Sequence, residues 1–459
     1  MKSLLTTLVL ALYFTTTTFA QNNNGGTGGG GNNGGGGGIN TGGNNNNGAG
    51  GILINPQGVV SSVSQTLPPA AMQARRVAFE SALHDDIKRQ TDLRYVSLVR
   101  LSKEVDTAIR DGRDITPDQF YLAGLTRIDE IFIDAEKDEL VIAGPAGAFG
   151  PDKENRIINL ETGRPCLRLD DLVESFACVS RRRQILCSID PVQDRLLRLQ
   201  DYLAKNSQPA SVDVIKQRYQ MMAKVLGEQE VRLEGVRTNS HLAVTLVEAD
   251  YRMKKVSLAL ENPRIKGFRS HLAMLKPQNG SFQRWFFLPY YDEIRGDREN
   301  THFVLTGQRL QLVGQEETVS ADGSRSDAVT TRKSTLDYAK QFTEKFPQLA
   351  AAMPVFAELQ NIVDMLTTAA LIDKYRLGEK VNWSGFDTTQ LPEKLPTYIV
   401  PKTVETLVNI QPNNGGMVLG LIAGGVIVNP QRIIANIQVG ELKQPKTSTP
   451  TDTWWWDAK

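Results

Sequence analysis

Paired carboxylates are the residues in this sequence whose types and spacing could do chemistry. Three close pairs stand out: Asp129 with Glu130, Asp170 with Asp171, and Glu248 with Asp250. Two acids held at the right separation can hydrolyse a glycosidic bond, but spacing along a chain does not give that separation. The alternative for each pair is a solvated face or a helix cap.

The segment around Glu248 is the best candidate for a binding site. On a predicted helix, Glu248 and Arg252 lie four residues apart on one face, in the order that favours an ion pair. Asp250 lies near the helix C-terminus, where an acid opposes the helix dipole. We therefore expect Asp250 to have a partner, either Arg284 or Lys254. A structural ion pair at this corner is the favoured interpretation. A ligand site formed by Glu248, Asp250, Arg252 and Arg284 is the alternative.

The cysteines leave two alternatives open. Cys178, late in a predicted helix, and Cys187, in the next strand, could form a disulfide in an exported protein. Alternatively Cys166, Cys178 and Cys187 are all reduced and buried, since a free cysteine packs as a small hydrophobe. A nucleophilic thiol needs a nearby base, and no histidine is close in sequence.

Other catalytic and ligand-binding motifs are absent from the sequence. The histidines, His84, His241, His271 and His302, have neither HxxxH nor HxH spacing, and neither a GxSxG nor a GxxxxGK[ST] motif occurs. We therefore predict no metal site and no cofactor. The run Arg181-Arg-Arg183 is interpreted as a basic loop.

Composition narrows the class of partner. The chain has 459 residues, with 52 Lys and Arg against 51 Asp and Glu, and a formal net charge of +1. This balance argues against a nucleic-acid partner. No apolar stretch reaches the roughly 18 residues of a membrane span, so we expect no transmembrane helix.

The N-terminus has the order of regions of a secretory signal. Lys2 precedes an apolar run from Leu4 to Phe14, and Thr18-Phe19-Ala20 resembles a signal peptidase site. We predict export to the periplasm or the medium, with cleavage after Ala20. The stretch Gln21–Gly51 is almost entirely Gly and Asn, a composition typical of a disordered spacer.

The rest of the chain alternates helical and strand patterns. It predicts an α/β or α+β fold with helices packed on a mixed sheet. A helical pair near 335–376 and a β-rich C-terminal region complete the fold. The predicted parts are a signal peptide (1–20), a spacer (21–51), an α/β body (52–325), a helical pair (326–380), a β-rich region (381–443) and a flexible tail (444–459).

The sequence also predicts the local structure of several short segments. Hairpins are predicted at 51–60 and at its near copy 425–434, in one sheet or two related ones, and a buried hairpin at 417–428. A helix is predicted to start at Thr116-Pro117-Asp118 and to stop at Gly124, and strands at 127–134 and 139–143 are predicted to pair around residues 135–138. Strands are also predicted at 256–260 and 302–313. The tail ends in Trp454-Trp-Trp456, which could make weak contact with a membrane interface or dock on the protein's own surface.

Several motifs resemble a known family. The strings Leu93-Arg-Tyr-Val-Ser-Leu98, Cys187-Ser-Ile-Asp-Pro191 and Val247-Glu-Ala-Asp-Tyr-Arg-Met-Lys254 are similar to secreted planctomycete proteins grouped as "domain of unknown function 1598". The resemblance runs from about residue 90 to residue 375. It implies export and a shared domain, and it implies no activity and no catalytic residues.

The resulting hypothesis is an exported binding or structural module of the cell envelope. Its partner would be an envelope or extracellular protein or polymer. The alternative is a carboxylate-dependent hydrolase that acts on a polymer outside the cytoplasm. The sequence alone does not decide whether the protein is an enzyme.

Export gives a first prediction. Mass spectrometry of the native protein should find an N-terminus at Gln21, because the small residues Thr18 and Ala20 suit signal peptidase. Intact Met1 in the cytosolic fraction would contradict export.

Overall fold

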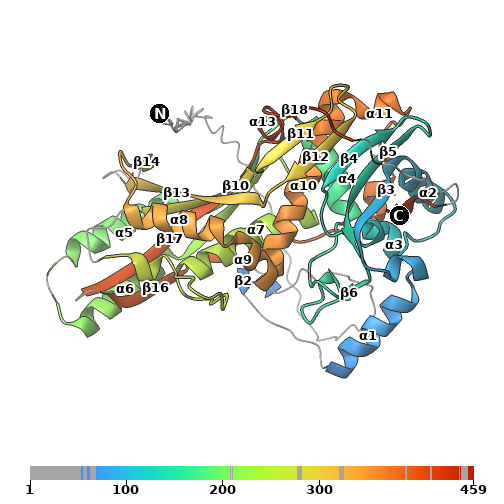
Figure 1. Ribbon diagram of the computed structural model, residues 1–459. Coiled ribbons are helices and arrows are strands. Elements are labelled where there is room, and N and C mark those ends of the chain that lie inside the picture. The colour runs from blue at the N-terminus through green and yellow to red at the C-terminus, as the bar shows by residue number, and fades with distance from the viewer. Residues whose placement is uncertain are drawn as a thin grey trace, which may run out of the picture. The chain divides into compact units, whose positions relative to one another are not determined.

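The computed structural model describes residues 53–54, 59–61, 69–206, 208, 210–276, 282–319, 325–387, 390–413, 416–443, 445 and 453–458. Helices and strands are interleaved along this part of the chain (Figure 1). The predicted mixture of helices with mixed sheets is therefore confirmed. The predicted signal peptide and the spacer Gln21–Gly51 lie outside the described residues.

The larger sheet is ten-stranded, with the order β1-β2-β15-β9-β8-β17-β10-β13-β14 and with β16 paired to β17 off this path. Most neighbours are antiparallel, but β10 runs parallel to β17 and β15 runs parallel to β2. The strands are β1 Leu53–Ile54, β2 Val59–Ser61, β8 Ile185–Asp190, β9 Glu228–Glu234, β10 Phe282–Tyr290, β13 Arg309–Val319, β14 Arg325–Asp327, β15 Thr403–Glu405, β16 Val408–Asn413 and β17 Gly416–Val428.

Side chains alternate between the two faces of a strand, so every second residue points into the core. In β8, Ile185, Cys187 and Ile189 are fully buried in the main hydrophobic cluster. On the other face, Leu186 and Asp190 are only half-buried, and the small Ser188 between them is buried. A one-residue shift in register would exchange these two sets.

The smaller sheet is seven-stranded, with the order β18-β11-β12-β4-β5-β3-β19. Its β4 and β5 pair antiparallel around residues 135–138, as the sequence predicts. A separate pair joins β6 and β7. The strands are β3 Thr91–Ser97, β4 Glu130–Asp134, β5 Glu139–Ala146, β6 Phe149–Pro151, β7 Ile157–Asn159, β11 Glu293–Gly296, β12 His302–Thr306, β18 Gln438–Val439 and β19 Trp455–Asp457.

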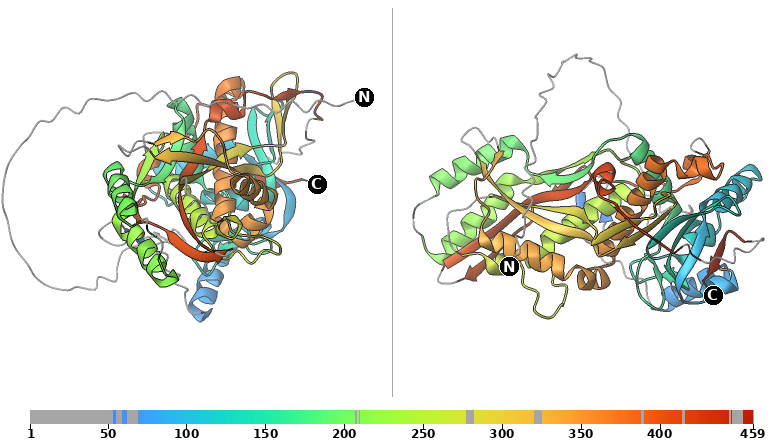
Figure 2. Two further views of the ribbon diagram at one scale, coloured as in Figure 1. Left: turned by 90° about the vertical axis from the view of Figure 1, so that its left-hand side faces the viewer. Right: turned by 45° about the horizontal axis from the view of Figure 1, so that its top comes forward.

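Helix α10 (Pro354–Tyr375) lies in the middle of the core. It packs against α4 (Leu169–Ser180) and α7 (His241–Ser257), and α7 in turn packs on β8 and β17 (Figures 1 and 2). Among the described helices, α10 is the one long and apolar enough to cross a membrane, and its apolar stretch is 100% buried inside the protein. That is the environment of a core helix.

The remaining helices cover the sheets or connect their strands. The predicted start at residues 116–118 is confirmed, because Thr116 and Gln119 form a capping box. These helices are α1 Pro69–Ser81, α2 Leu98–Arg110, α3 Pro117–Phe120, α5 Gln193–Lys205, α6 Val212–Leu226, α8 Lys333–Glu344, α9 Phe346–Ala352, α11 Leu377–Lys380, α12 Leu391–Lys394 and α13 Pro430–Ile433, with 3-10 turns at Asp85–Lys88, Leu122–Gly124 and Leu272–Met274.

Two predicted strands are wrong. The segment 256–260 is not a strand, because α7 continues to Ser257. The buried residues Ala249, Met253 and Val256 follow helical spacing, which the alternating pattern of the next few residues obscured. The segment 302–313 is two strands, β12 and β13, separated where Gly307 has φ 96.

Two predicted hairpins near the C-terminus are also wrong. Residues 417–428 belong to the single long strand β17, which pairs with β16, β8 and β10. In the segment 425–434 the strand is followed by α13, capped by Asn429 with Pro430 in its first turn. The hairpin at 51–60 is confirmed as β1 and β2, and it shares one sheet with β17.

The triple-tryptophan end also differs from expectation. Trp455 and Trp456 belong to β19, which pairs with β3, and they are 9% and 6% exposed. Two indole rings with so little exposure are not available to a membrane interface. They dock on the protein itself, and residues 455–457 are a sheet strand and not a flexible tail.

Gly424 permits the parallel contact between β17 and β10. Its φ is +139, and a Cβ there would lie 1.9 Å from the carbonyl oxygen of Trp285. We expect Gly424→Ala to lower the free energy of unfolding by about 3 kcal/mol through backbone strain and overpacking. Denaturant unfolding would measure this. Gly440→Ala is the matched control, because nothing lies within 4 Å of its Cβ position, and it should unfold like the parent. Equal stability of all three proteins would contradict the role of Gly424.

Candidate functional site

The four residues of the predicted binding site form ion pairs with different partners. Glu248 is buried and forms an ion pair with Arg156, at 2.5 Å between Oε1 and Nη2. Arg252 pairs instead with Glu261, at 2.7 Å. The predicted ion pair between Glu248 and Arg252 is therefore wrong. Arg156, which is distant in sequence, pairs with Glu248 in place of Arg252, which is on the same helix.

Asp250 is held inside the protein. Of the two candidate partners, Lys254 makes the contact, with its Nζ 2.9 Å from Asp250 Oδ2. The same ammonium donates a hydrogen bond to the Ile189 carbonyl in β8. Burial raises the pKa of Asp250 to about 6, and Lys254 opposes that rise. Arg284 lies near another acid, Asp190, at 3.8 Å.

Arg156 joins three parts of the fold. It precedes β7, and its two terminal nitrogens contact Glu248 on α7 and Glu358 on α10. All three side chains are nearly excluded from solvent. Burial raises the pKa of the Glu248 carboxyl, whereas Arg156 favours its charged form. Sequence reasoning missed this cluster, although the isolated charge of Glu358 in the apolar α10 was a usable signal.

A second buried cluster lies further along α10. Arg309 of β13 contacts Asp364 on α10 at 2.9 Å and Asp129 at 2.8 Å. The hydroxyl of Tyr291 donates a hydrogen bond to Asp364. The ring nitrogen of His302 lies 3.1 Å from Glu130. Both members of the pair Asp129 and Glu130 are therefore engaged in ion pairs or hydrogen bonds.

The third acid pair lies beside the start of α7. Asp170 contacts Arg168 at 2.8 Å, and Asp171 contacts Nδ1 of His241 at 2.8 Å. An acid and a histidine can activate a nucleophile when a hydroxyl or thiol meets the other ring nitrogen. Within the part of the chain that the structure describes, no such hydrogen bond to His241 Nε2 occurs. The pair instead links α4 to the N-terminus of α7.

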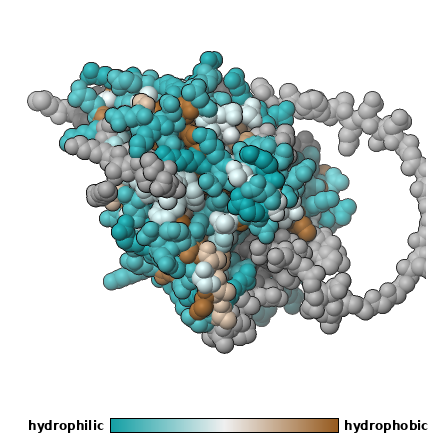
Figure 3. Space-filling view, turned by 90° about the vertical axis from the view of Figure 1, so that its right-hand side faces the viewer, coloured by the Kyte–Doolittle hydropathy of each residue, from teal (hydrophilic) through white to brown (hydrophobic). Residues whose placement is uncertain are grey.

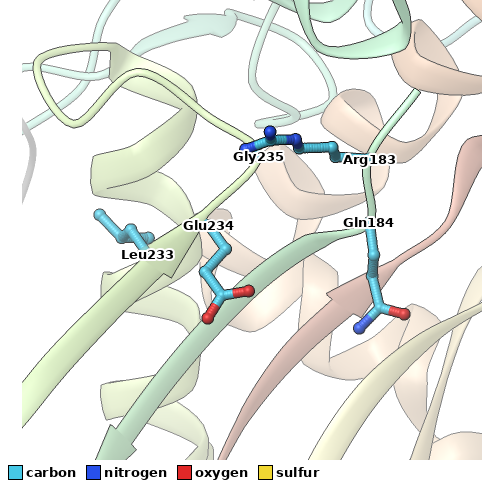
Figure 4. Close-up of a pocket in the computed structure, with 5 residues that line it drawn as sticks. All are labelled: Arg183, Gln184, Leu233, Glu234 and Gly235. Carbon is cyan, nitrogen blue, oxygen red and sulfur yellow. The ribbon is translucent and has the colours of Figure 1, made fainter. Parts of the chain in front are cut away.

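An open pocket lies where β9 ends and β8 begins. Its volume is about 530 Å³, and it is lined by Arg183, Gln184, Leu233, Glu234 and Gly235. In Figure 4 the Arg183 side chain extends toward Gly235, and the polar ends of Gln184 and Glu234 lie along the same side of the strands. The pocket thus has three polar or charged side chains, Arg183, Gln184 and Glu234, beside the apolar Leu233.

Further arginines lie next to the residues that line this pocket, and Arg181 donates a hydrogen bond to the Gly235 carbonyl at 3.4 Å. Glu174, which is fully buried on α4, accepts hydrogen bonds from Arg181 Nη1 at 3.2 Å and from the Arg237 backbone at 2.9 Å. The guanidinium of Arg237 also contacts Glu174. These two arginines keep 38% and 37% of their side chains exposed. Arg182 and Arg183 are exposed as well, so the predicted basic loop forms one wall of the pocket.

The cysteines form no disulfide. Cys166, Cys178 and Cys187 are all free and buried, so the proposed bond between Cys178 and Cys187 is absent. The Cys178 thiol donates a weak hydrogen bond to Glu174 at 3.5 Å, and burial raises its pKa. Among the described residues, no group of three or more His, Cys, Asp or Glu side chains is placed to hold a metal ion.

Comparison with known proteins identifies one region. Residues 187–271 match the family described as "Protein of unknown function (DUF1598)". The chain is similar to this family over that region. This region runs from β8 to the turn after α7, and it includes Leu233, Glu234 and Gly235 of the pocket. No curated protein and no solved structure matches the chain.

The cluster around Arg156 gives a prediction for stability. Arg156→Met leaves Glu248 and Glu358 buried without their cation, which should lower the free energy of unfolding by about 3–5 kcal/mol at pH 8. Denaturant unfolding at pH 8 and pH 5 would measure this. The loss should be smaller at pH 5. The folded variant would bind more protons than the unfolded chain, so its stability falls as pH rises.

A matched control is Arg298→Met, since Arg298 and Glu441 are 72% and 87% exposed. It should leave the unfolding free energy unchanged. Adding Glu248→Gln and Glu358→Gln to Arg156→Met should restore part of the loss. A loss that these changes do not reduce, and that does not depend on pH, would contradict the ionic account.

Proposed function

We propose that this protein is an exported, non-catalytic binding module that holds an anionic polymer outside the cytoplasm. The observation that carries the proposal is the arginine-walled pocket between β8 and β9. Arg183 lines it and Arg181 donates a hydrogen bond to the carbonyl of its Gly235, while Arg182 and Arg237 neighbour these residues in sequence; the acids nearby are Glu234 and Glu174. The pocket therefore has an excess of positive charge on a chain whose formal net charge is only +1.

Guanidinium groups suit a ligand that carries carboxylate or sulfate groups. Their planar fork matches two oxygen atoms of such an anion. The buried Glu174 forms ion pairs with Arg181 and Arg237, and more than a third of each arginine side chain stays exposed. Two arginines are thus partly ordered before a ligand arrives, which lowers the entropy cost of binding.

The surface position of the pocket favours a polymer over an enclosed small molecule. Arg182 and Arg183 are exposed side chains of one loop, so they can meet successive charges of an extended chain. Each contact would be weak and salt-dependent, and several together would give useful affinity. The signal-like N-terminus supports placing this interaction in the periplasm or the medium.

The alternative, a carboxylate-dependent hydrolase, has less support. Such an enzyme needs two acids that face one substrate. The acids singled out from the sequence contact cations, histidines or both instead of facing the pocket: Asp129, Glu130, Asp170, Asp171, Glu248 and Asp250. The pocket itself holds a single acid, Glu234, among its lining residues.

Binding to polygalacturonate tests the proposal. The parent protein should bind this polycarboxylate, and affinity should fall as salt is added because the charges are exposed. The double variant Arg182→Ala, Arg183→Ala should bind about tenfold more weakly or worse, since each lost charged contact is worth about 1 kcal/mol or more. Isothermal titration calorimetry would measure both.

Two controls separate this site from general charge effects. Arg298→Ala removes an exposed arginine elsewhere on the protein and should bind like the parent. Neutral dextran should not bind. Equal affinity of the double variant and the parent, or equal binding of dextran, would refute the proposed site.

A further inference from the structure

Arg164 is a cation that the fold leaves without a carboxylate. It lies half-buried in the turn between β7 and α4. Its guanidinium makes a single hydrogen bond, from Nη2 to Gln360 Oε1 at 3.1 Å. Its Nε is enclosed in the protein and has no hydrogen-bond partner. Within the residues that the structure describes, Arg164 therefore contacts a neutral amide and forms no ion pair.

The turn that carries Arg164 is held against α10. The Arg164 carbonyl accepts a hydrogen bond from the Asn159 amide at 2.8 Å, and Asn361 Nδ2 donates to the Pro165 carbonyl at 3.0 Å. The Nε2 of Gln360 donates to the carbonyl of residue 308 at 2.7 Å, which leaves its Oε1 for Arg164. The guanidinium is thus partly ordered before any ligand arrives, which lowers the entropy cost of binding.

The two acids that act on this guanidinium already have other partners. The carboxylate of Asp364 accepts hydrogen bonds from Arg309 Nε and from the Tyr291 hydroxyl, both at 2.9 Å, and from one backbone amide. Asp129 contacts Arg127 at 2.7 Å and Arg309 at 2.8 Å. Neither acid pairs with Arg164, so a counter-charge for it has to come from a bound molecule.

The charges around Arg164 do not balance. Burial lowers the pKa of its guanidinium, and the neighbouring cations Arg127 and Arg309 lower it further, whereas Asp364 and Asp129 act in the opposite direction. Three guanidinium groups thus share two carboxylates, which leaves one positive charge over. Such a charge is costly where water is partly excluded, and one monoanion would neutralise it.

Two of these three arginines have donors left for an anion. Arg309 is only 3% exposed, and it donates to two carboxylates and to two backbone carbonyls. Arg127 keeps 39% of its side chain exposed and contacts Asp129 through Nε and Nη2. Within the described residues, Nη1 makes no hydrogen bond in either Arg127 or Arg164. An anion that arrives from solvent can therefore meet both side chains, but not Arg309.

We propose that Arg164 and Arg127 bind one carboxylate group of a small organic acid. A carboxylate has two oxygens in one plane, which suits the flat donor edges of guanidinium groups. Its single charge cancels the one that the cluster leaves over. A phosphate carries about −1.5 to −2 at neutral pH and would place excess negative charge beside Asp129 and Asp364. This site uses none of the residues that line the pocket between β8 and β9.

The character of the surface also favours a polar ligand. The side of the protein shown in Figure 3 is mostly hydrophilic, and its hydrophobic side chains form small separate groups. Exposed apolar residues such as Val77, Ile399 and Val439 come from different elements. An ordered guanidinium without a counter-charge is therefore a stronger anchor for a ligand than these scattered apolar side chains.

Thermal unfolding of the full chain in sodium acetate tests the site. Acetate is compared at pH 7 with chloride and with phosphate at equal ionic strength. At about ten times its Kd, acetate should raise the Tm of the parent by about 1–2 °C over chloride, because it binds the folded state. Arg164→Gln should lose this shift. In chloride it should melt at the parent's temperature or above, since it removes an unbalanced charge and glutamine can still donate to Gln360.

Two controls should keep the acetate shift. Arg298→Gln makes the same change at an arginine that is 72% exposed. The double variant Arg182→Ala, Arg183→Ala alters the pocket between β8 and β9, so it separates this site from the proposed polymer site. Loss of the shift in the double variant would assign the effect to that pocket and overturn the proposal.

Three further results would also overturn it. The first is an acetate shift that persists in Arg164→Gln. The second is an equal shift of the parent in phosphate, or no shift of acetate over chloride, since the site would then not select a carboxylate. The third is a Tm of Arg164→Gln far below that of the parent in chloride, which would show that Arg164 stabilises the fold without a ligand.

Discussion

Buried pairs of guanidinium and carboxylate groups around α10 are the constraint on which the rest of this structure depends. Glu358 and Asp364 are buried acids of α10, and each needs a cation inside the core. Arg156 and Arg309 supply these charges from segments that lead to β7 and β13. Because a buried charge without a partner costs several kcal/mol, the two arginines fix how α10 sits against its neighbours. Packing of the apolar side chains alone would allow small shifts that these ion pairs exclude.

The same constraint separates structural acids from those available to a ligand. Glu248 and Asp250, the strongest candidates from the sequence, neutralise Arg156 and Lys254 inside the fold. Glu174 has an intermediate position, since it is buried but holds Arg181 and Arg237 partly exposed at the surface. A carboxylate in the core thus organises cations that a partner can reach. This is why the proposed function rests on arginines of loops and not on the acid pairs of helices.

Arg94, next to the edge of the smaller sheet, is also a buried cation that needs a carboxylate partner. It is as buried as the arginines near α10, yet its carboxylate comes from Asp457, almost at the end of the chain. A short strand with two tryptophans therefore completes both an edge and an ion pair.

Local sequence patterns determined the mixed α and β class, the capped helix at Thr116, the hairpin of β4 and β5, and the helices α8 and α10. These features depend on short-range periodicity, caps and turns, which a single sequence displays. Only the tertiary structure decided the partners of the charged residues. Glu248 could have paired with Arg252 four residues away, but burial of α7 turned it toward Arg156, which lies 92 residues before it in sequence. Likewise, Trp455 and Trp456 look like a tail in the sequence, and they become a strand because β3 offers an open edge with a buried arginine. Long-range electrostatics and strand pairing have no local signature, so the fold itself had to specify them.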